Sequence, residues 1–253
     1  MNASVESIVP FNQFIDSAQG DRLHGNRGDW LSEIKEKGRI EFYKLGWPSP
    51  KFESWRYTNL NKLAKTQFFL PRDIELAELP YQDILPVDAP KIALVNGKFN
   101  RELSDLSTIS EGILVNNFQD MSDEQRALFS LENPTSLPKE GLPINALNDA
   151  ILSDVLFIEI RPGWQSDVPL HIVSIGCGDH VGFSSKIFVS AGENCHLDIV
   201  ESHAGEHGST YFSSCVSNID IKAGARLGHY KLQNDTNTST HLALTQTSIE
   251  ADA

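Results

Sequence analysis

The sequence predicts a mainly β protein with a helical N-terminal domain, whose β half is a right-handed parallel β-helix. From Leu156 onward, apolar and polar residues alternate with a period of two, which is typical of β-strands. The same half repeats a strand, a small turn and a second strand about every 30 residues, as stacked solenoid coils do. A jelly roll or cupin is the alternative arrangement for strands of this kind.

Length and charge limit the classes of protein that fit. The chain has 253 residues and a formal net charge of −13, which allows one large domain or two smaller ones. We expect no nucleic-acid partner, because phosphate contacts need clustered Lys and Arg. We also expect no membrane association, because no apolar run is long enough to cross a bilayer. Three cysteines cannot all pair within one chain, and no basic signal segment opens it, so we predict a cytoplasmic protein.

Residues 1–85 are predicted to form the helical domain. Apolar residues recur at helical spacing over residues 29–43, and this stripe is expected to pack against a core. Asp29 is the expected N-cap of the helix, and Gly46 followed by Pro48 is the expected stop signal.

Residues 86–253 are predicted to form the β-helix domain, with an irregular lead-in over residues 86–154. In the lead-in, Asn96-Gly97 between apolar runs predicts a hairpin, because both turn residues accept a positive φ. A short helix is expected over residues 124–131 with Ser122 as its cap.

The regular repeats are predicted for residues 155–253. Their turns are expected at Gly163, Gly192, Gly224 and Asp252, where a corner favours a residue without a Cβ. The last unit stops as its turn begins, and no cap for the open strand edge is visible. The pattern therefore predicts an incomplete β-helix, truncated at the C-terminus.

The cysteines are interpreted as core residues rather than ligands. Cys195 has the strand parity of Leu197 and Ile199, and Cys215 that of Ile219. Buried free cysteines usually behave as small hydrophobic residues.

The other metal-binding candidate is the group Glu201, His203 and His207. A metal-dependent β protein, cupin-like or polysaccharide-acting, is the alternative function that it would support. Gly205 lies inside the group, however, and the local pattern favours a solvated loop. Since the chain also lacks a phosphate-binding loop and a nucleophile elbow, we expect no enzyme activity and no catalytic residue.

Three segments resemble the SufB/SufD family of iron–sulfur cluster assembly subunits, the SufD branch more closely than the SufB branch. The first, GWPSPKFESWRYTNL at residues 46–60, has the family's order of aromatic and charged residues. The second covers residues 95–106 and the third covers residues 145–163. The family motif in the first segment consists of Gly46, Pro48, Lys51, Glu53, Trp55, Arg56, Tyr57 and Thr58.

The resemblance implies a non-catalytic scaffold that acts with a SufB-like paralogue and a SufC-like ABC-type ATPase. It implies that the complete complex assembles the iron–sulfur cluster and that this segment binds no cofactor itself. The ATPase-docking and cluster-assembly positions of the family fall beyond Ala253, so no such residue is assigned here. The motif around Trp55 is expected to be structural. A homodimer is a further assembly that the sequence leaves open.

Overall fold

Two five-stranded sheets face each other in the computed structural model, which describes residues 10–19, 26–72, 89–107, 109, 111–131 and 137–253. The first sheet has the order β10-β8-β6-β4-β3 and the second the order β2-β1-β5-β7-β9. The strands of the first sheet are β3 (Ile113–Asn117), β4 (Leu152–Ile160), β6 (Val181–Ala191), β8 (Tyr211–Ile221) and β10 (Thr240–Ile249). The strands of the second sheet are β1 (Lys91–Val95), β2 (Lys98–Asp105), β5 (Leu170–Gly176), β7 (His196–Gly205) and β9 (Arg226–Asn234).

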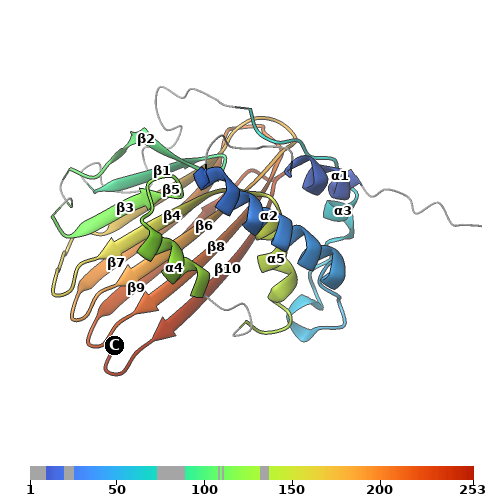
Figure 1. Ribbon diagram of the computed structural model, residues 1–253. Coiled ribbons are helices and arrows are strands. Elements are labelled where there is room, and N and C mark those ends of the chain that lie inside the picture. Colours follow the sequence, from blue (N-terminus) through green and yellow to red (C-terminus); the bar gives the residue numbers. More distant parts are fainter. Residues whose placement is uncertain (1–9, 20–25, 73–88, 108, 110, 132–136) are drawn as a thin grey trace, which may run out of the picture.

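From β4 to β10 the chain alternates between the two sheets, so that each coil stacks on the one before it (Figure 1). The ladders β4–β6–β8–β10 and β5–β7–β9 are all parallel. The predicted β-solenoid is therefore confirmed. A jelly roll or cupin is wrong, since those folds are built from antiparallel strands. At the opposite edge, the β1–β2 and β3–β4 pairs are antiparallel.

The space between the two sheets is filled by inward-facing apolar side chains. Because strand neighbours alternate between faces, alternate residues of the central strands enter this core. In the parallel ladder, Ile158 stacks on Val189 and Val189 on Ile219. The buried core of the solenoid includes Leu156, Ile160, Leu170, Ile172, Ile187, Cys195, Leu197, Ile199, Cys215 and Ile221.

At one of the two corners of each coil, a single residue in the left-handed conformation recurs. Gly163, Asn194, Gly224 and Asp252 have φ of 72°, 56°, 68° and 62°. The predicted corner at Gly192 is thus wrong by two residues, because asparagine also tolerates this conformation. Gly192 has another role: a Cβ there would lie 2.6 Å from the carbonyl oxygen of Ile160.

Helices cover the outer face of the sheet that contains β4, β6, β8 and β10 (Figure 1). They are α1 (Pro10–Ser17), α2 (Asn26–Leu45), α3 (Asn61–Ala64), α4 (Asp123–Leu131) and α5 (Leu142–Ala150), with a 3₁₀ turn, η1, at Glu53–Trp55. The helix expected from residue 29 begins at Asn26 instead and ends before Gly46, whose φ is 70°. Ser122 caps α4 as expected, because its Oγ accepts a hydrogen bond from the backbone N–H of Gln125 at 3.2 Å.

The helices share cores with the solenoid. Phe11 of α1, Phe68 and Leu147 of α5 form one apolar cluster with Phe212 of β8. Phe157 and Phe188, stacked at 4.9 Å on neighbouring strands, anchor a second cluster under α2 and α4. The predicted domain boundary between residues 85 and 86 lies outside the described residues.

The predicted hairpin at residues 96 and 97 is confirmed, with φ of 48° at Asn96 and 78° at Gly97. A Cβ on Gly97 would lie 2.5 Å from the backbone oxygen of Ser184. Replacing Gly97 with alanine should therefore lower the free energy of unfolding by about 2–4 kcal/mol, since left-handed strain and the steric clash add. Urea unfolding measures this loss.

Gly163 provides the matched control for Gly97. Its φ of 72° is similar, but nothing lies within 4 Å of a Cβ built there. Its replacement by alanine should cost only about 1 kcal/mol, from strain alone. Equal losses in the two variants would show that contact with Ser184 does not constrain the hairpin.

The carboxyl group of Asp154 joins the hairpin to β4. It accepts hydrogen bonds from the backbone N–H groups of Phe99 at 3.0 Å, Val155 at 2.8 Å and Phe118 at 3.4 Å. Burial of this side chain, which is 5% exposed, raises its pKa to about 6 in spite of these bonds. Between about pH 4 and pH 6 the folded protein therefore retains a proton that the unfolded chain has lost.

We expect this proton to make stability depend on pH. Since the folded state binds more protons at Asp154 between about pH 4 and pH 6, the contribution of this side chain to the free energy of unfolding should fall by about 2–3 kcal/mol across that window and stay level above it. Asp154→Asn does not titrate, so the difference in urea midpoint between wild type and this variant isolates the effect. A difference that is constant with pH would contradict the prediction.

Candidate functional site

A set of polar side chains replaces the apolar filling between the sheets at β7, β8 and β9. On β7, the inward positions of Leu197 and Ile199 are followed by Glu201 and His203, which are 1% and 4% exposed. We call the set the interior polar cluster. It consists of Glu201, His203, Cys215, Ser217, His229 and Lys231.

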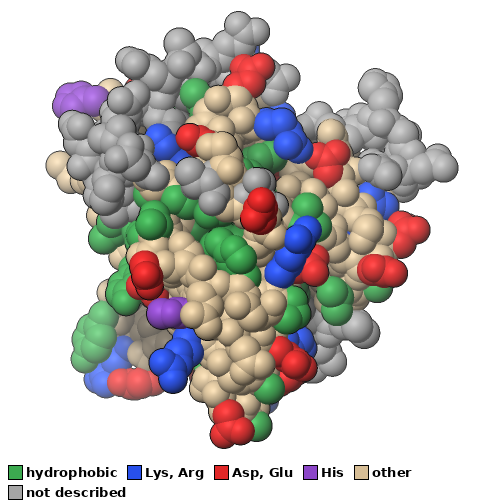
Figure 2. All heavy atoms as spheres, turned by 90° about the vertical axis from the view of Figure 1, so that its left-hand side faces the viewer, with side chains coloured by type: hydrophobic (Ala, Val, Ile, Leu, Met, Phe, Trp, Pro, Cys, Tyr) green, Lys and Arg blue, Asp and Glu red, His purple; other side chains and the backbone are tan. Residues whose placement is uncertain are grey.

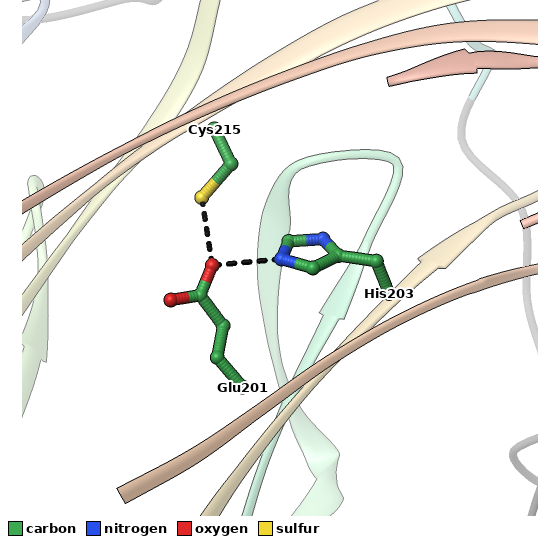
Figure 3. Close-up of side chains that lie close together, drawn as sticks. All are labelled: Glu201, His203 and Cys215. Atoms are coloured by element: carbon green, nitrogen blue, oxygen red, sulfur yellow. Dashed lines mark hydrogen bonds and ion pairs between the residues drawn. The ribbon is translucent and has the colours of Figure 1, made fainter. Parts of the chain in front are cut away.

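Glu201 is the centre of the interior polar cluster. One carboxylate oxygen, Oε1, accepts hydrogen bonds from His203 Nε2 at 2.7 Å and Cys215 Sγ at 3.3 Å (Figure 3). The same oxygen lies 2.9 Å from Lys231 Nζ. These contacts come from both sheets, since Cys215 belongs to β8 and the other residues to β7 and β9.

The second oxygen of Glu201 is also fully occupied. Oε2 accepts hydrogen bonds from Ser217 Oγ at 3.0 Å and His229 Nε2 at 2.9 Å. A buried carboxylate with this many donors is held in one orientation.

Burial and neighbouring charges set the protonation states. Burial pushes the pKa of Glu201 upward, but hydrogen bonds from His203 and His229 and the charge of Lys231 outweigh it and hold the pKa well below its usual value. Burial, helped by the negative charge of Glu201, raises the pKa of Cys215 to about 12. The cluster thus holds an ionised carboxylate beside a protonated thiol.

A second polar group lies next to the interior polar cluster. The rings of His203 and His241 have centroids 4.2 Å apart, and His241 Nδ1 is 2.8 Å from Ser213 Oγ. Burial and the neighbouring His203 lower the pKa of His241 to about 4. The hydroxyl of Tyr211 donates a hydrogen bond to Oδ1 of Asp235.

The structure brings together two of the three residues of the predicted metal group. Glu201 and His203 lie buried on β7, so the loop expected there is wrong. Gly205 is the last residue of β7, and a Cβ there would lie 2.2 Å from the ring of Tyr211, so this position requires glycine for close packing. His207 is exposed in the turn after β7, and Cys215 takes its place beside Glu201.

All three cysteines are free and buried. Cys195 packs in the apolar core of the solenoid, and Cys177 packs in a smaller apolar cluster. Cys215 also faces inward, as its parity indicates, but its sulfur contacts the carboxylate of Glu201. Glu201 stands two residues after Ile199 and therefore faces the same side of the strand. This was the sequence signal that could have located the interior polar cluster.

The residues of the family motif lie in and around η1. The indole of Trp55 packs against the cluster of Phe11 and donates Nε1–H to the backbone oxygen of Glu140 at 3.1 Å. Tyr57 is 89% exposed, and the guanidinium of Arg56 lies 5.5 Å from the centre of its ring. Gly46 and Pro48 belong to the turn after α2, while Lys51, Glu53 and Thr58 are exposed.

The surface carries charges of both signs. Figure 2 shows Lys and Arg side chains lying among Asp and Glu side chains on the face that it draws. Among the described helices, none has the length and apolar character that a membrane span needs.

Fold and site together define a class: a two-sheet β-solenoid, covered by helices on one face, with a buried polar cluster between its sheets. Comparison with family models narrows this class. Residues 12–172 match the SufBD protein N-terminal region, and residues 174–253 match the SufBD core domain of the SUF system for FeS cluster assembly. The chain belongs to the SufB/SufD family of iron–sulfur cluster assembly proteins.

Two curated relatives agree with this assignment. The chain is 24% identical over 222 residues to the iron–sulfur cluster assembly protein SufD of Escherichia coli, covering 84% of this chain and 48% of that protein. It is 22% identical over 211 residues to an iron–sulfur cluster assembly SufBD family protein of Synechocystis, covering 78% of this chain and 46% of that protein. The chain thus spans about half the length of these relatives.

Proposed function

We propose that this protein is a non-catalytic scaffold subunit of iron–sulfur cluster assembly, which acts in the cytoplasm with a SufB-like paralogue and a SufC-like ABC-type ATPase. The observation that carries the proposal is the match of the two SufB/SufD family regions, end to end, over residues 12–172 and 174–253. The similarity to SufD of Escherichia coli supports the choice of the SufD branch. The cluster itself is the product of the complete assembly.

The arrangement of side chains supports a non-catalytic role. Glu201 is already bonded through both oxygens, and the protonated thiol of Cys215 is a weak nucleophile. Neither residue is poised for acid–base or nucleophilic chemistry. The exposed pair of Arg56 and Tyr57, by contrast, is available to a protein partner.

The test is recovery of the partners from the native cells. The natural gene, extended by a C-terminal affinity tag, should yield a SufC-like ATPase and a SufB-like paralogue when the protein is purified. The protein alone should hydrolyse no ATP. An untagged strain is the control, and absence of both partners would overturn the proposal.

The 253-residue chain allows a second measurement. The resemblance to the family implies that the ATPase-docking positions fall beyond Ala253, so we expect this chain to bind the ATPase weakly or not at all. Tight binding would contradict that part of the proposal and would place the docking surface within residues 1–253.

A further inference from the structure

We propose that Glu201, His203 and Cys215 form a binding site for one divalent transition-metal ion of the Zn²⁺ class, and that Lys231 occupies this site when the metal is absent. The proposal concerns this chain's own interior and does not depend on its partners. It differs from the metal group expected from the sequence, since Cys215 replaces His207.

The geometry of the three side chains suits a small ion. One carboxylate oxygen, one imidazole nitrogen and one sulfur all lie within 4.8 Å of one another, and the nitrogen and the sulfur both point at Oε1 of Glu201 (Figure 3). Tetrahedral zinc has bonds of about 2.0–2.3 Å to these atom types, so its ligand atoms lie about 3.3–3.8 Å apart, and small side-chain movements would open the hydrogen-bonded contacts to that spacing. Binding releases the thiol proton of Cys215 to solvent and requires His203 to carry its proton on Nδ1, so that Sγ and Nε2 are free to donate to the ion. A set of one oxygen, one nitrogen and one sulfur favours Zn²⁺, Co²⁺ or Fe²⁺ over Mg²⁺ and Ca²⁺.

The ligands are held by rigid elements. Glu201 and His203 lie on β7 and Cys215 on β8, so the two facing sheets of the solenoid fix them across the interior. Ser217 and His229 hold the second oxygen of Glu201. Such outer contacts keep a ligating carboxylate in its orientation, and they leave Oε1 to face the centre.

The position of Lys231 shows that the site already attracts a cation. Its ammonium lies 2.9 Å from Oε1, the oxygen that His203 and Cys215 also contact. A metal ion on this oxygen and the ammonium exclude each other. The side chain of Lys231 is 27% exposed and flexible, so it can withdraw to solvent when an ion enters.

The preceding coil shows that a polar interior is not required by the fold. In the ladder, Glu201 stands between Ile172 and Lys231, so an apolar position becomes a charged one. Burying a carboxylate is costly, and apolar residues of similar volume are often equally stable. Stability alone therefore gives little reason for this set of residues.

The experiment is a titration of the metal-free 253-residue chain with Co²⁺, followed by competition with Zn²⁺. Cobalt bound to a thiolate in tetrahedral geometry gives a sulfur-to-metal absorption band and intense visible bands. We expect one equivalent of cobalt to produce these bands, one equivalent of Zn²⁺ to remove them, and the unfolding temperature to rise with metal.

Three variants assign the site. Cys215→Ser should abolish the thiolate band, whereas Cys195→Ser, a matched buried cysteine on the same solenoid core, should leave it unchanged. His203→Gln should weaken binding by more than about tenfold, which even loss of an outer partner of a metal ligand can cause. Lys231→Met should strengthen binding on the order of tenfold, because the competing cation is gone.

The effect of Lys231→Met separates a metal site from a structural ion pair, since a purely structural lysine would not oppose metal. Circular dichroism verifies that each variant folds. If Cys215→Ser does not fold, the cobalt affinities of His203→Gln and Lys231→Met test the site instead. No cobalt band in both wild type and Lys231→Met, or a band retained in Cys215→Ser, would overturn the proposal. Either result would leave the proposed role in cluster assembly, and its partner-recovery test, unaffected.

Discussion

Replacing Glu201 with alanine should lower the free energy of unfolding by about 3–5 kcal/mol, the usual loss when one partner of a buried ion pair is removed. The change leaves Lys231, His203 and His229 without the carboxylate that they share inside the solenoid. It also leaves the hydroxyl of Ser217 without its acceptor. The loss should appear as a large shift in the urea midpoint of the metal-free chain.

Glu159 is the matched control for Glu201. It lies on β4 and is half-buried, and its side chain faces Gln125 rather than the interior of the solenoid. Its replacement by alanine should cost less than about 1 kcal/mol. A similar cost at the two positions would show that the interior polar cluster contributes nothing beyond an ordinary strand carboxylate.

A double-mutant cycle tests whether the charges act together. In wild type, Lys231→Met removes the partner of a buried carboxylate and should destabilise. In a Glu201→Leu background the ammonium has no carboxylate partner and can turn to solvent, so the same change should have little effect on stability. We expect a coupling free energy of about 1–3 kcal/mol, the range for residues in one network. The same effect of Lys231→Met in both backgrounds would contradict the network.

The period-two pattern was sufficient to predict the solenoid because strand parity is a local property. Every second residue from Leu156 to Ile160 faces inward, as predicted, and the same holds for the coil from Ile187 to Ala191. The corners were harder to predict from the sequence, because both glycine and asparagine can adopt the left-handed conformation. Alignment on glycine selected Gly192, whereas Asn194 has the positive φ.

The candidate site was only half visible in the sequence. Glu201 and His203 were recognised as ligand types, but Gly205 made their strand look like a loop. Glycine is needed at position 205 because the ring of Tyr211, which comes later in the chain, packs where a Cβ would be. Cys215 and Lys231 reach Glu201 from other coils, and such contacts depend on register between strands, which spacing along the chain does not encode.

The interface between helices and solenoid could not be predicted either, because outward apolar residues such as Phe212 and Phe188 read as ordinary strand residues. Both are buried on the helix-covered face of the first sheet. A sheet buried on both faces has apolar residues at both parities, and this obscures which side each one takes. The helical region and the β region therefore looked more separate in sequence than they are in the fold.

Replacing Phe212 with alanine should lower the free energy of unfolding by about 3–5 kcal/mol, as for other fully buried phenylalanines. The ring is 0% exposed, and its centre lies 5.2 Å from that of Phe11 and 5.8 Å from that of Phe68. Because α1 has only 8 residues, it is too short to be stable without docking. Hydrogen exchange of the α1 amides should therefore accelerate far more than the global loss of stability explains.

Phe188→Ala separates a local effect from a general one. Phe188 is 3% exposed on the neighbouring strand of the same sheet, but it stacks on Phe157 beneath α2 and α4 rather than beneath α1. Phe188→Ala should lower the free energy of unfolding by an amount similar to that of Phe212→Ala, while exchange of the α1 amides accelerates only as much as the global loss of stability explains. Equal acceleration of α1 exchange in both variants would mean that α1 does not depend on Phe212 in particular. A selective effect would show that the N-terminal helix is stable because it docks on β8, and that the helical region and the solenoid form one cooperative unit.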